Sequence, residues 1–397
     1  MKQQKIESLT DILHTVQEAL EHLKQTDNEE LQQSLSAGRA VVTKELETEL
    51  GCSLEQRVNI SQLSDEEWLY NALHILKELS TPFQPLNTFD LEFFSLIKHL
   101  WSKSEVEIFQ SAKLYTQRLK DSSSEIYHKF VDYFSRFPLW GSFSPEENDW
   151  TTLELRAAVL KRHSYDFLWL YRRLEDYLSK RTLTAILRNW AFLDTDYPQI
   201  VKSVFPDYWE PDIFSNNHND VLVDVGAYVG DSIANYLNTY GTGFRKIYAY
   251  EISPDSYNIL CSNIKKWNLP NIIPRQKGVG AEHGEAFLHL NSDASANKLQ
   301  KNGEGQRTEI VTLDDDAPDA TFIKMDIEGA EQNALLGSQN LIREKHPKLA
   351  ICIYHGYEDI WKIPSMIDEL NPDYRFYLRH NGGNLIPTEF VLLCKPQ

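Results

Sequence analysis

Hydrophobic residues in the first half of the chain recur at three- and four-residue steps, the period of an amphipathic helix. One such apolar stripe consists of Leu9, Ile12, Leu13, Val16, Leu20 and Leu23. A second helix is predicted after Ser64, because the sequence Ser-Asp-Glu-Glu places acids in a first helical turn. Further helical pattern covers about 90–137 and 150–193, with prolines at 82–85 and 138–145 as breaks. The first half is therefore predicted to be helical.

The second half has a different pattern, in which short apolar runs rich in Val, Ile, Tyr and Phe alternate with helical segments. The runs typical of strands are 221–227, 246–252, 271–279, 286–290, 308–313, 320–327, 348–355, 374–380 and 388–394. Helices fit between them at about 230–240, 254–268, 330–346 and 357–370. This alternation predicts an α/β fold with βαβ units around a mostly parallel sheet. The last two runs are joined by Asn-Gly-Gly-Asn and should form an antiparallel hairpin.

Composition narrows the class of protein. The 397 residues contain 40 Lys+Arg and 58 Asp+Glu, a net charge of −18, with 42% hydrophobic and 25% charged residues. These values are typical of a globular protein of about two domains. The acidic balance argues against nucleic acid and anionic membrane as partners, since both need clustered Lys and Arg. No apolar stretch of about 18 residues is present, and the first residues resemble an ordinary helix, not a leader.

Glycine and cysteine usage give the domain boundary and the compartment. Only Gly38, Gly51 and Gly141 of the 17 glycines precede residue 212, so the loops that approach a ligand are expected in the second half. We predict a helical accessory domain over 1–205 and a second, site-bearing domain over 206–397. Four scattered cysteines without a C-x-x-C motif favour isolated thiols in a reducing cytoplasm.

The first chemical motif is VLVDVGAYVGDS, residues 221–232. A strand ends near Asp224, glycines follow, and a helix begins near Asp231, so the backbone can approach a ligand at the strand's carboxyl end. The spacing G-x-x-x-G differs from the dinucleotide fingerprint, and Asp224 and Asp231 would repel a diphosphate. A cationic ligand such as S-adenosylmethionine suits this loop better. The alternative is a tight turn that binds nothing.

The second motif is KIYAYEISPDSYNIL, residues 246–260. A carboxylate at the tip of a second strand, here Glu251, can accept hydrogen bonds from both ribose hydroxyls. The alternative is that Glu251 caps the next helix, but Pro254 in the first turn leaves Ser253 for that role. A weaker signal, the G-V-G within 275–290, would place Lys277–Val279 beside an adenine ring.

The third strong motif is FIKMDIEGAEQNALLG, residues 322–337. Three acids within six residues at a strand tip are costly if buried without partners, so they indicate a cation, a proton or solvent. Asp326 and Glu328 alternate along an extended segment and can face one crevice. The alternative, that acids stabilise a helix N-terminus, explains Glu331 better than Asp326.

Together, DVGAYVGDS, the strand-end Glu251 and IKMDIEGAE resemble the FkbM-type family of S-adenosylmethionine-dependent O-methyltransferases over roughly residues 205–397. DYWEPDIF (207–214), LAICIYHGYEDIWKIP (349–364) and YRFYLRHNGGNLIPTEFVLLC (374–394) also fit this resemblance. It implies a seven-stranded, Rossmann-like class I methyltransferase sheet with an antiparallel C-terminal hairpin. It further implies methyl transfer from S-adenosylmethionine to a hydroxyl, commonly on a sugar, a glycan or a secondary metabolite.

These motifs assign the candidate site residues. The cofactor is expected to contact Asp224, Gly226, Ala227, Tyr228, Gly230, Asp231, Ser232, Glu251, Ile252, Gly278, Val279 and Asp326. The catalytic candidates are Asp326, His355, Glu328 and Lys324, because a hydroxyl acceptor needs a general base within hydrogen-bond reach. His380 could reach the same side of the sheet from the hairpin, but it is interpreted as a surface histidine. Asp326 or Glu328 could orient the acceptor or help to bind a divalent cation such as magnesium, but nothing in the spacing demands a metal and none is assigned.

A second hypothesis is a non-catalytic carbohydrate-binding or assembly protein that retains the fold. The complete set of strand-end acids favours the enzyme, because a decayed site would be expected to lose some of them. The predicted partners are thus a small-molecule or glycan acceptor and, through the helical half, a second copy of the chain in a homodimer. The helical half would alternatively position the acceptor.

Overall fold

A computed structural model describes residues 3–24, 26, 28–137, 140–289, 298–300, 306–383 and 385–397. The chain forms two compact units, which are described separately. Unit 1 comprises Met1–Arg172 and Thr184–Asp194, and unit 2 comprises Arg173–Leu183 and Thr195–Gln397. Among the helices of the described ranges, none has the length and apolar character needed to cross a membrane.

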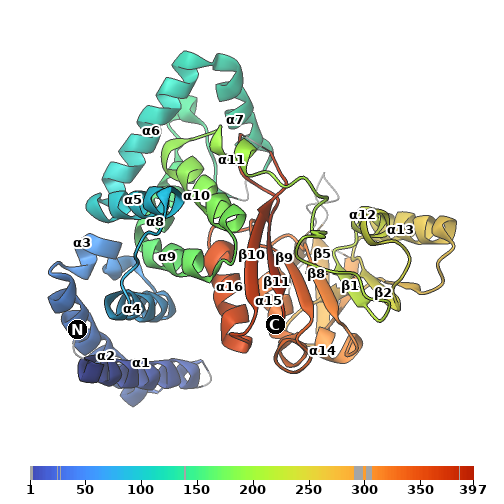
Figure 1. Ribbon diagram of the computed structural model, residues 1–397, viewed down its shortest axis with the longest axis horizontal. Coiled ribbons are helices and arrows are strands. Elements are labelled where there is room, and N and C mark those ends of the chain that lie inside the picture. Colours follow the sequence, from blue (N-terminus) through green and yellow to red (C-terminus); the bar gives the residue numbers. More distant parts are fainter. Residues whose placement is uncertain are drawn as a thin grey trace. The chain divides into compact units, whose positions relative to one another are not determined.

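The N-terminal region is helical, as the apolar periodicity predicts (Figure 1). Its helices are α1 (Gln3–Leu23), α2 (Glu29–Leu50), α3 (Leu54–Val58), α4 (Asp65–Ser80), α5 (Thr88–Ser102), α6 (Glu105–Ser122), α7 (Ser124–Arg136), α8 (Thr151–Arg162), α9 (Ser164–Arg173), α10 (Tyr177–Phe192) and α11 (Tyr197–Ile200). The predicted stripe lies on α1, where Leu9, Leu13 and Val16 are buried. The helix expected after Ser64 begins there, with a capping box between Ser64 and Glu67.

Two details of this region differ from the sequence expectation. The helical pattern over 90–137 is divided into α5, α6 and α7, because Ser104 and Ser123 cap two new helices. Helix α2 was not expected, since only Leu35, Val42 and Leu46 of its 22 residues are buried. So few buried positions leave a weak apolar stripe.

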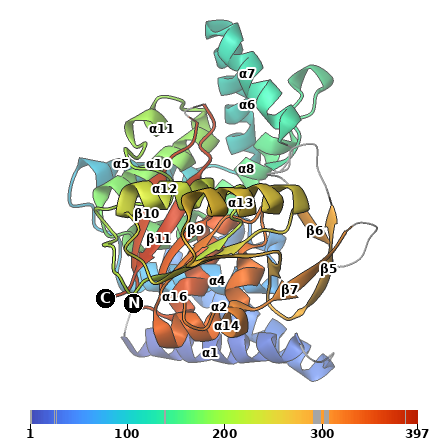
Figure 2. The same ribbon diagram turned by 90° about the vertical axis from the view of Figure 1, so that its right-hand side faces the viewer.

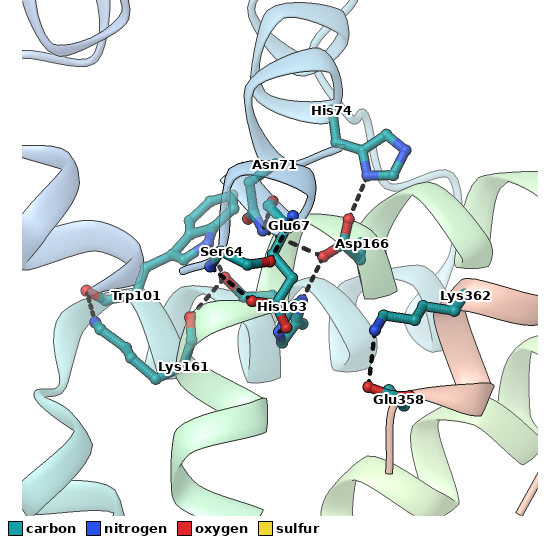
Figure 3. A network of polar contacts seen from close by, with 11 residues as sticks. Ser64, Glu67, Asn71, His74, Trp101, Lys161, His163, Asp166, Glu358 and Lys362 are labelled. Carbon is teal, nitrogen blue, oxygen red and sulfur yellow. Dashed lines mark hydrogen bonds and ion pairs between the residues drawn. The ribbon is translucent and has the colours of Figure 1, made fainter. Parts of the chain in front are cut away.

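Unit 1 contains a buried polar network around Asp166 of α9 (Figure 3). Its carboxylate lies 2.5 Å from Nδ1 of His74 and 2.8 Å from Nδ1 of His163. Burial raises the pKa of Asp166, but the two histidines outweigh it and the net shift is downward. Lys161, also buried, donates to the backbone carbonyls at the end of α5, those of Leu100, Trp101 and Lys103. These contacts satisfy carbonyls that the helix itself leaves unpaired.

Unit 2 is built on a seven-stranded sheet in the order β10-β11-β9-β8-β1-β2-β3. The strands are β1 (Val221–Val225), β2 (Lys246–Tyr250), β3 (Ile272–Arg275), β8 (Phe322–Met325), β9 (Lys348–Cys352), β10 (Arg375–His380) and β11 (Phe390–Lys395). All neighbours run parallel except β11, which is antiparallel to both β9 and β10. The predicted class I methyltransferase sheet with its C-terminal hairpin is confirmed.

A second sheet, in the order β4-β7-β5-β6, was not expected. It contains β4 (Gly278–Val279), β5 (Gly284–His289), β6 (Lys298–Gln300) and β7 (Gln306–Val311). The apolar run 271–279 therefore divides between two sheets, with β3 in the large one and β4 in the small one. Residue 290, the end of one predicted run, lies outside the described residues.

Helices cover both faces of the large sheet. In Figure 2, α12 (Asp231–Tyr240) and α13 (Pro254–Trp267) lie on one side, with α14 (Leu313–Asp316) and α16 (Asp359–Leu370) on the other. The predicted helix 330–346 is interrupted: α15 (Glu331–Leu336) is followed by a separate π-helical turn, Leu341–Lys345. At the break, a Cβ on Gly337 would lie 2.0 Å from the carbonyl oxygen of Gly280. Such a close backbone approach requires glycine.

Candidate active site

The loop between β1 and α12 lies at the carboxyl end of the sheet. Gly226 has φ +80°, and a Cβ there would lie 1.9 Å from the backbone oxygen of Asp326. Gly230 (φ +90°) precedes the first residue of α12, and Tyr228 adopts φ +46°, a rare value for a side-chain-bearing residue. Glycine is thus required where the tips of β1 and β8 meet. The predicted turn is confirmed as a structure; its ligand stays a prediction.

Asp224 and Lys324 form a buried ion pair between neighbouring strands β1 and β8. Lys324 Nζ lies 3.0 Å from Asp224 Oδ1, and the two side chains are 2% and 0% exposed. Ser232 donates to the other Asp224 oxygen at 2.5 Å, and Lys324 also donates to the carbonyl of Gly226 at 2.7 Å. Burial lowers the pKa of Lys324, but the carboxylates of Asp224 and Asp326 outweigh it and raise the pKa. Asp224, Ser232 and Lys324, all predicted site residues, therefore form a buried polar network that contacts the loop after β1.

Glu251 lies directly after β2, beside the same loop. Its carboxylate accepts hydrogen bonds from the backbone N–H of Tyr228 at 2.8 Å and of Ser253 at 2.7 Å. Burial raises the pKa of Glu251, while these two donors act in the opposite direction. Ser253 caps α13 and Pro254 opens it, as the sequence predicts. The hydrogen bond from Tyr228 thus links the end of β2 to the loop that follows β1.

The acids after β8 meet His355, which follows β9. His355 Nε2 lies 3.3 Å from Asp326 Oδ1 and 3.8 Å from Glu328 Oε1, while Nδ1 lies 2.9 Å from Glu331 Oε1. Burial lowers the pKa of His355, but the charge of Glu331 and the contact with Asp326 raise it well above its usual value. Burial raises the pKa of Asp326, but the hydrogen bond and charge of His355 lower it by more. The pKa of Asp326 is therefore below its usual value.

Two further residues belong to this cluster and were not predicted as site residues. Tyr208 donates to Asp326 Oδ2 at 2.6 Å, and Tyr354 lies between Asp326 Oδ1 (3.4 Å) and Glu389 (3.3 Å). Burial raises the pKa of Glu389 to about 7, and the charges of Asp326 and Asp207 add to the shift. Tyr208 belongs to the DYWEPDIF segment, which is the only sequence signal for its role. Its contact with Asp326 spans 118 positions and needs the folded chain.

The remaining predicted residues lie in the β1 loop, at the start of α12, after β2 and in the small sheet. Ala227 is buried in the β1 loop, Asp231 begins α12, and Ile252 follows Glu251. Gly278 and Val279 form β4, which pairs with β7 in the small sheet. The interpretation of His380 as a surface histidine is wrong: the residue is 1% exposed, and its Nδ1 lies 2.8 Å from the carbonyl oxygen of Thr388. Strand β10 continues through His380, which places that ring inside the unit.

Three side chains of the cluster offer ligand atoms that a metal ion could share. Asp326, Glu331 and His355 each place one such atom within 4.8 Å of the others. For an organic cofactor, the available groups are the glycine loop after β1 and the carboxylates of Glu251 and Asp326.

Parts of this chain are similar to known proteins. Residues 224–384 match the methyltransferase FkbM domain. The crystal structure of methyltransferase FkbM from Methylobacillus flagellatus has a TM-score of 0.51 and 24% identity, covering 68% of this chain and 71% of that one. A precorrin-6y C5,15-methyltransferase from Geobacter metallireducens has a TM-score of 0.30, 13% identity and coverages of 46% and 82%. An rRNA methylase from Streptococcus thermophilus has a TM-score of 0.29, 16% identity and coverages of 47% and 91%. No curated protein matches the chain.

The sheet order, the antiparallel hairpin and the glycine loop at the strand ends define a methyltransferase domain of the Rossmann-like class. Residues 224–384, less than half of the chain, are similar to the FkbM methyltransferase domain. The resemblance predicted from the motifs is confirmed.

Proposed function

We propose that this protein is an S-adenosylmethionine-dependent O-methyltransferase acting on a hydroxyl of a sugar, a glycan or a secondary metabolite. The observation that carries the proposal is the contact between Glu251 and the backbone N–H of Tyr228. It places a carboxylate at the tip of β2 directly against the glycine loop of β1. Open α/β sheets bind ligands at this crevice, and a carboxylate in this position suits a ribose.

The charge of the site supports a cationic cofactor. The carboxylates of Asp326 and Glu328 both contact His355, and Tyr354 links Asp326 to Glu389. The cation of Lys324 is already paired with Asp224. The sulfonium and ammonium groups of S-adenosylmethionine are favoured where carboxylates outnumber cations. Gly278 and Val279 lie three and four residues after the end of β3 and are the proposed neighbours of the adenine ring.

Methyl transfer to oxygen is an in-line displacement, so the residues must align the acceptor and accept its proton. Bound S-adenosylmethionine would supply the methyl group as an electrophile. Asp326 and Glu328 are the proposed acceptor-facing carboxylates, since their side chains are 21% and 27% exposed. His355, 1% exposed, positions Asp326 through the contact at Nε2. Lys324 holds the loop through the Gly226 carbonyl and acts as a positioning residue.

Isothermal titration with S-adenosylmethionine tests the cofactor assignment. We expect the wild type to bind and Glu251→Ala to bind at least about tenfold more weakly, because one lost charged hydrogen-bond acceptor is worth about 1.5–3 kcal/mol. Glu344→Ala is the matched control, because Glu344 is exposed on the π-helical turn. Absence of binding by the wild type, or equal binding by Glu251→Ala, would refute the assignment.

Transfer of a labelled methyl group to glycans, nucleotide-sugars and small hydroxyl compounds tests the activity itself. We expect a product of increased mass on an acceptor hydroxyl, and loss of the product with Asp326→Asn. A protein that binds carbohydrate and S-adenosylmethionine but transfers no methyl group would instead support the non-catalytic hypothesis.

A further inference from the structure

We propose that Glu389 is the general base that removes the proton from the acceptor hydroxyl. Glu389 lies between β10 and β11, directly before the first residue of β11. The motifs at the strand ends did not single it out, although it belongs to the segment 374–394 that resembles the family. This inference deepens the proposed O-methyltransferase function and rests on it.

The antiparallel pairing of β11 brings Glu389 to the edge of the sheet that carries the candidate site. Val391 of β11 pairs with Cys352, the last residue of β9. The start of β11 therefore lies beside the carboxyl end of β9, where the other site residues gather. At this edge, Glu389 Oε2 lies 3.3 Å from the hydroxyl of Tyr354, which follows β9.

The backbone of Glu389 adopts a conformation that is uncommon for a residue with a side chain. Its φ is +53°, and two other residues of the site, Glu328 (+57°) and Tyr208 (+69°), are also in the left-handed region. Such conformations are unfavourable and persist where surrounding contacts fix them, often at functional sites. One such contact is the hydrogen bond that Asn381 N–H donates to the Glu389 carbonyl at 3.0 Å.

Two neighbouring groups of the site are poor proton acceptors. Burial lowers the pKa of His355, but Glu331 and Asp326 raise it well above its usual value, so the ring is protonated at neutral pH. A protonated imidazole has no nitrogen lone pair left to accept a proton. Asp326 accepts a hydrogen bond from Tyr208 at 2.6 Å, and its pKa is held below the usual range. A carboxylate stabilised in this way has little tendency to take up a proton.

The surroundings of Glu389 instead favour proton uptake. Burial raises the pKa of Glu389 to about 7, and the charges of Asp326 and Asp207 add to this shift. The hydrogen bond from Tyr354 and the charge of His355 act in the opposite direction. A general base is most effective when its pKa lies near the working pH. The residue is also partly exposed, so an acceptor can reach its carboxylate.

Tyr354 links the proposed base to Asp326. Its hydroxyl lies 3.3 Å from Glu389 Oε2 and 3.4 Å from Asp326 Oδ1, and it has one proton to donate. Once Glu389 is protonated, its new O–H can donate to the Tyr354 oxygen while the Tyr354 hydroxyl donates to Asp326. Tyr354 is therefore a positioning residue that stabilises the protonated form of the base.

The proposed step balances in atoms and electrons. The acceptor O–H bond breaks, and its proton passes to the Glu389 carboxylate. The electron pair left on the acceptor oxygen forms the new bond to the methyl carbon. The bond between that carbon and sulfur breaks, and its electron pair stays on the sulfur, which loses its positive charge. Glu389 then releases the proton to solvent and is ready for another cycle.

Single-turnover methyl transfer tests the base directly, because it separates the chemical step from product release. Full-length protein is mixed with labelled S-adenosylmethionine and the compound that becomes methylated among glycans, nucleotide-sugars and small hydroxyl compounds. The wild-type rate should fall about tenfold per pH unit below about pH 7, where Glu389 becomes protonated. Glu389→Gln should be at least about a hundredfold slower at about pH 8 and should lack this pH dependence. Glu389→Asp keeps a carboxylate and should retain it.

Binding measurements separate a base from a structural residue. Isothermal titration with S-adenosylmethionine should give the same affinity for the wild type, Glu389→Gln and the control Glu344→Gln, whose side chain is exposed on the π-helical turn. Weaker binding by Glu389→Gln, or a wild-type rate in this variant, would overturn the proposal. So would a pH dependence that persists in Glu389→Gln. Asp359→Asn would then show whether its source is Asp359, whose pKa burial raises to about 6.

A titration of the protein without S-adenosylmethionine makes the test independent of any acceptor. Carboxyl ¹³C NMR of glutamate-labelled protein follows the Glu389 resonance, which is identified by its absence from Glu389→Gln and Glu389→Asp. Its midpoint should lie near pH 7. A midpoint near the ordinary value of about 4.3 would overturn the proposal.

The outcomes distinguish this proposal from the proposed function. If the wild type and Glu389→Gln methylate an acceptor equally well, the proposed function stands and only the assignment of the base fails. If the wild type methylates no acceptor, the proposed function fails and the assignment of the base fails with it.

Discussion

Removal of the Lys324 charge should destabilise the core of unit 2 more than removal of any partly exposed lysine charge. Lys324 and Asp224 are almost completely buried and lie 3.0 Å apart. The substitution Lys324→Met keeps a long apolar side chain but leaves the Asp224 carboxylate buried without its cation. Loss of one partner of a buried pair costs about 3–5 kcal/mol. The hydrogen bond from Ser232 remains and does not replace the lost charge.

Hydrogen exchange of the amides in β1 and β8 is the assay, because it reports on this unit alone in a chain of two units. A loss of about 3–5 kcal/mol corresponds to exchange faster by a factor on the order of 10² to 10³. The control is Lys362→Met, which breaks the pair between Lys362 of α16 and Glu358, the residue before that helix (Figure 3). That pair is 26% and 47% exposed, and its loss should cost less than about 0.5 kcal/mol.

The single variants Asp224→Asn and Lys324→Met and the double variant that combines them form a double-mutant cycle. The cost of the double variant should be smaller than the sum of the two single costs, because neither charge is then left unpaired. If exchange in Lys324→Met matches that in Lys362→Met, the buried pair does not stabilise the strand tips and the reasoning is refuted.

Three further predictions concern other positions. Gly226→Ala should abolish S-adenosylmethionine binding and lower the thermal midpoint, because the new Cβ would collide with backbone and Gly226 has a positive φ. The control Gly284→Ala should do neither, because the space around Gly284 is open. In unit 1, burial lowers the pKa of Lys161 to about 8, below the unfolded value of 10.5. Its charge therefore opposes folding below pH 8, and urea unfolding should show wild type gaining stability relative to Lys161→Met between pH 8 and 10.5. Asp166→Asn should lower the free energy of unfolding by about 2–4 kcal/mol, because the buried histidines lose their charged partner. The exposed control Asp132→Asn should lower it by less than about 0.5 kcal/mol. Equal urea midpoints for the two variants would contradict this prediction.

Much of the architecture was predictable because its signals are local. The apolar runs at 221–227 and 246–252 become β1 and β2, and the last two runs become the antiparallel pair β10 and β11. Helix starts at Ser64 and Ser253 followed from capping chemistry within four residues. Period, turn residues and caps are properties of short segments, so the sequence alone carries them.

The assignment of strands to sheets was not predictable in the same way. The run 271–279 resembles one strand, yet β3 pairs with β2 and β4 pairs with β7. The choice depends on partners far along the chain, which no local pattern specifies. Helix α2 was missed for a related reason, since its few buried residues find their partners only in the folded unit.

The same distinction between local and long-range information applies to the candidate site. Asp224, Glu251, Asp326 and His355 were identified from the sequence because each lies at the end of an apolar run, where parallel strands bring their tips to one edge. How each carboxylate is used depends on its partners. Asp224 is neutralised by Lys324, while Glu331, expected only to stabilise a helix start, lies against His355.

The sequence by itself thus determined the resemblance to the FkbM domain, the positions of most strands along the chain and the acids at their tips, because motif spacing and periodicity are encoded over a few residues. Only the tertiary structure decided which of those acids are paired, buried or open to a ligand. It also brought Tyr208 to Asp326 and assembled Asp326, Glu331 and His355 into one cluster. Charge pairing and desolvation depend on distances between segments, and those distances exist only once the chain has folded.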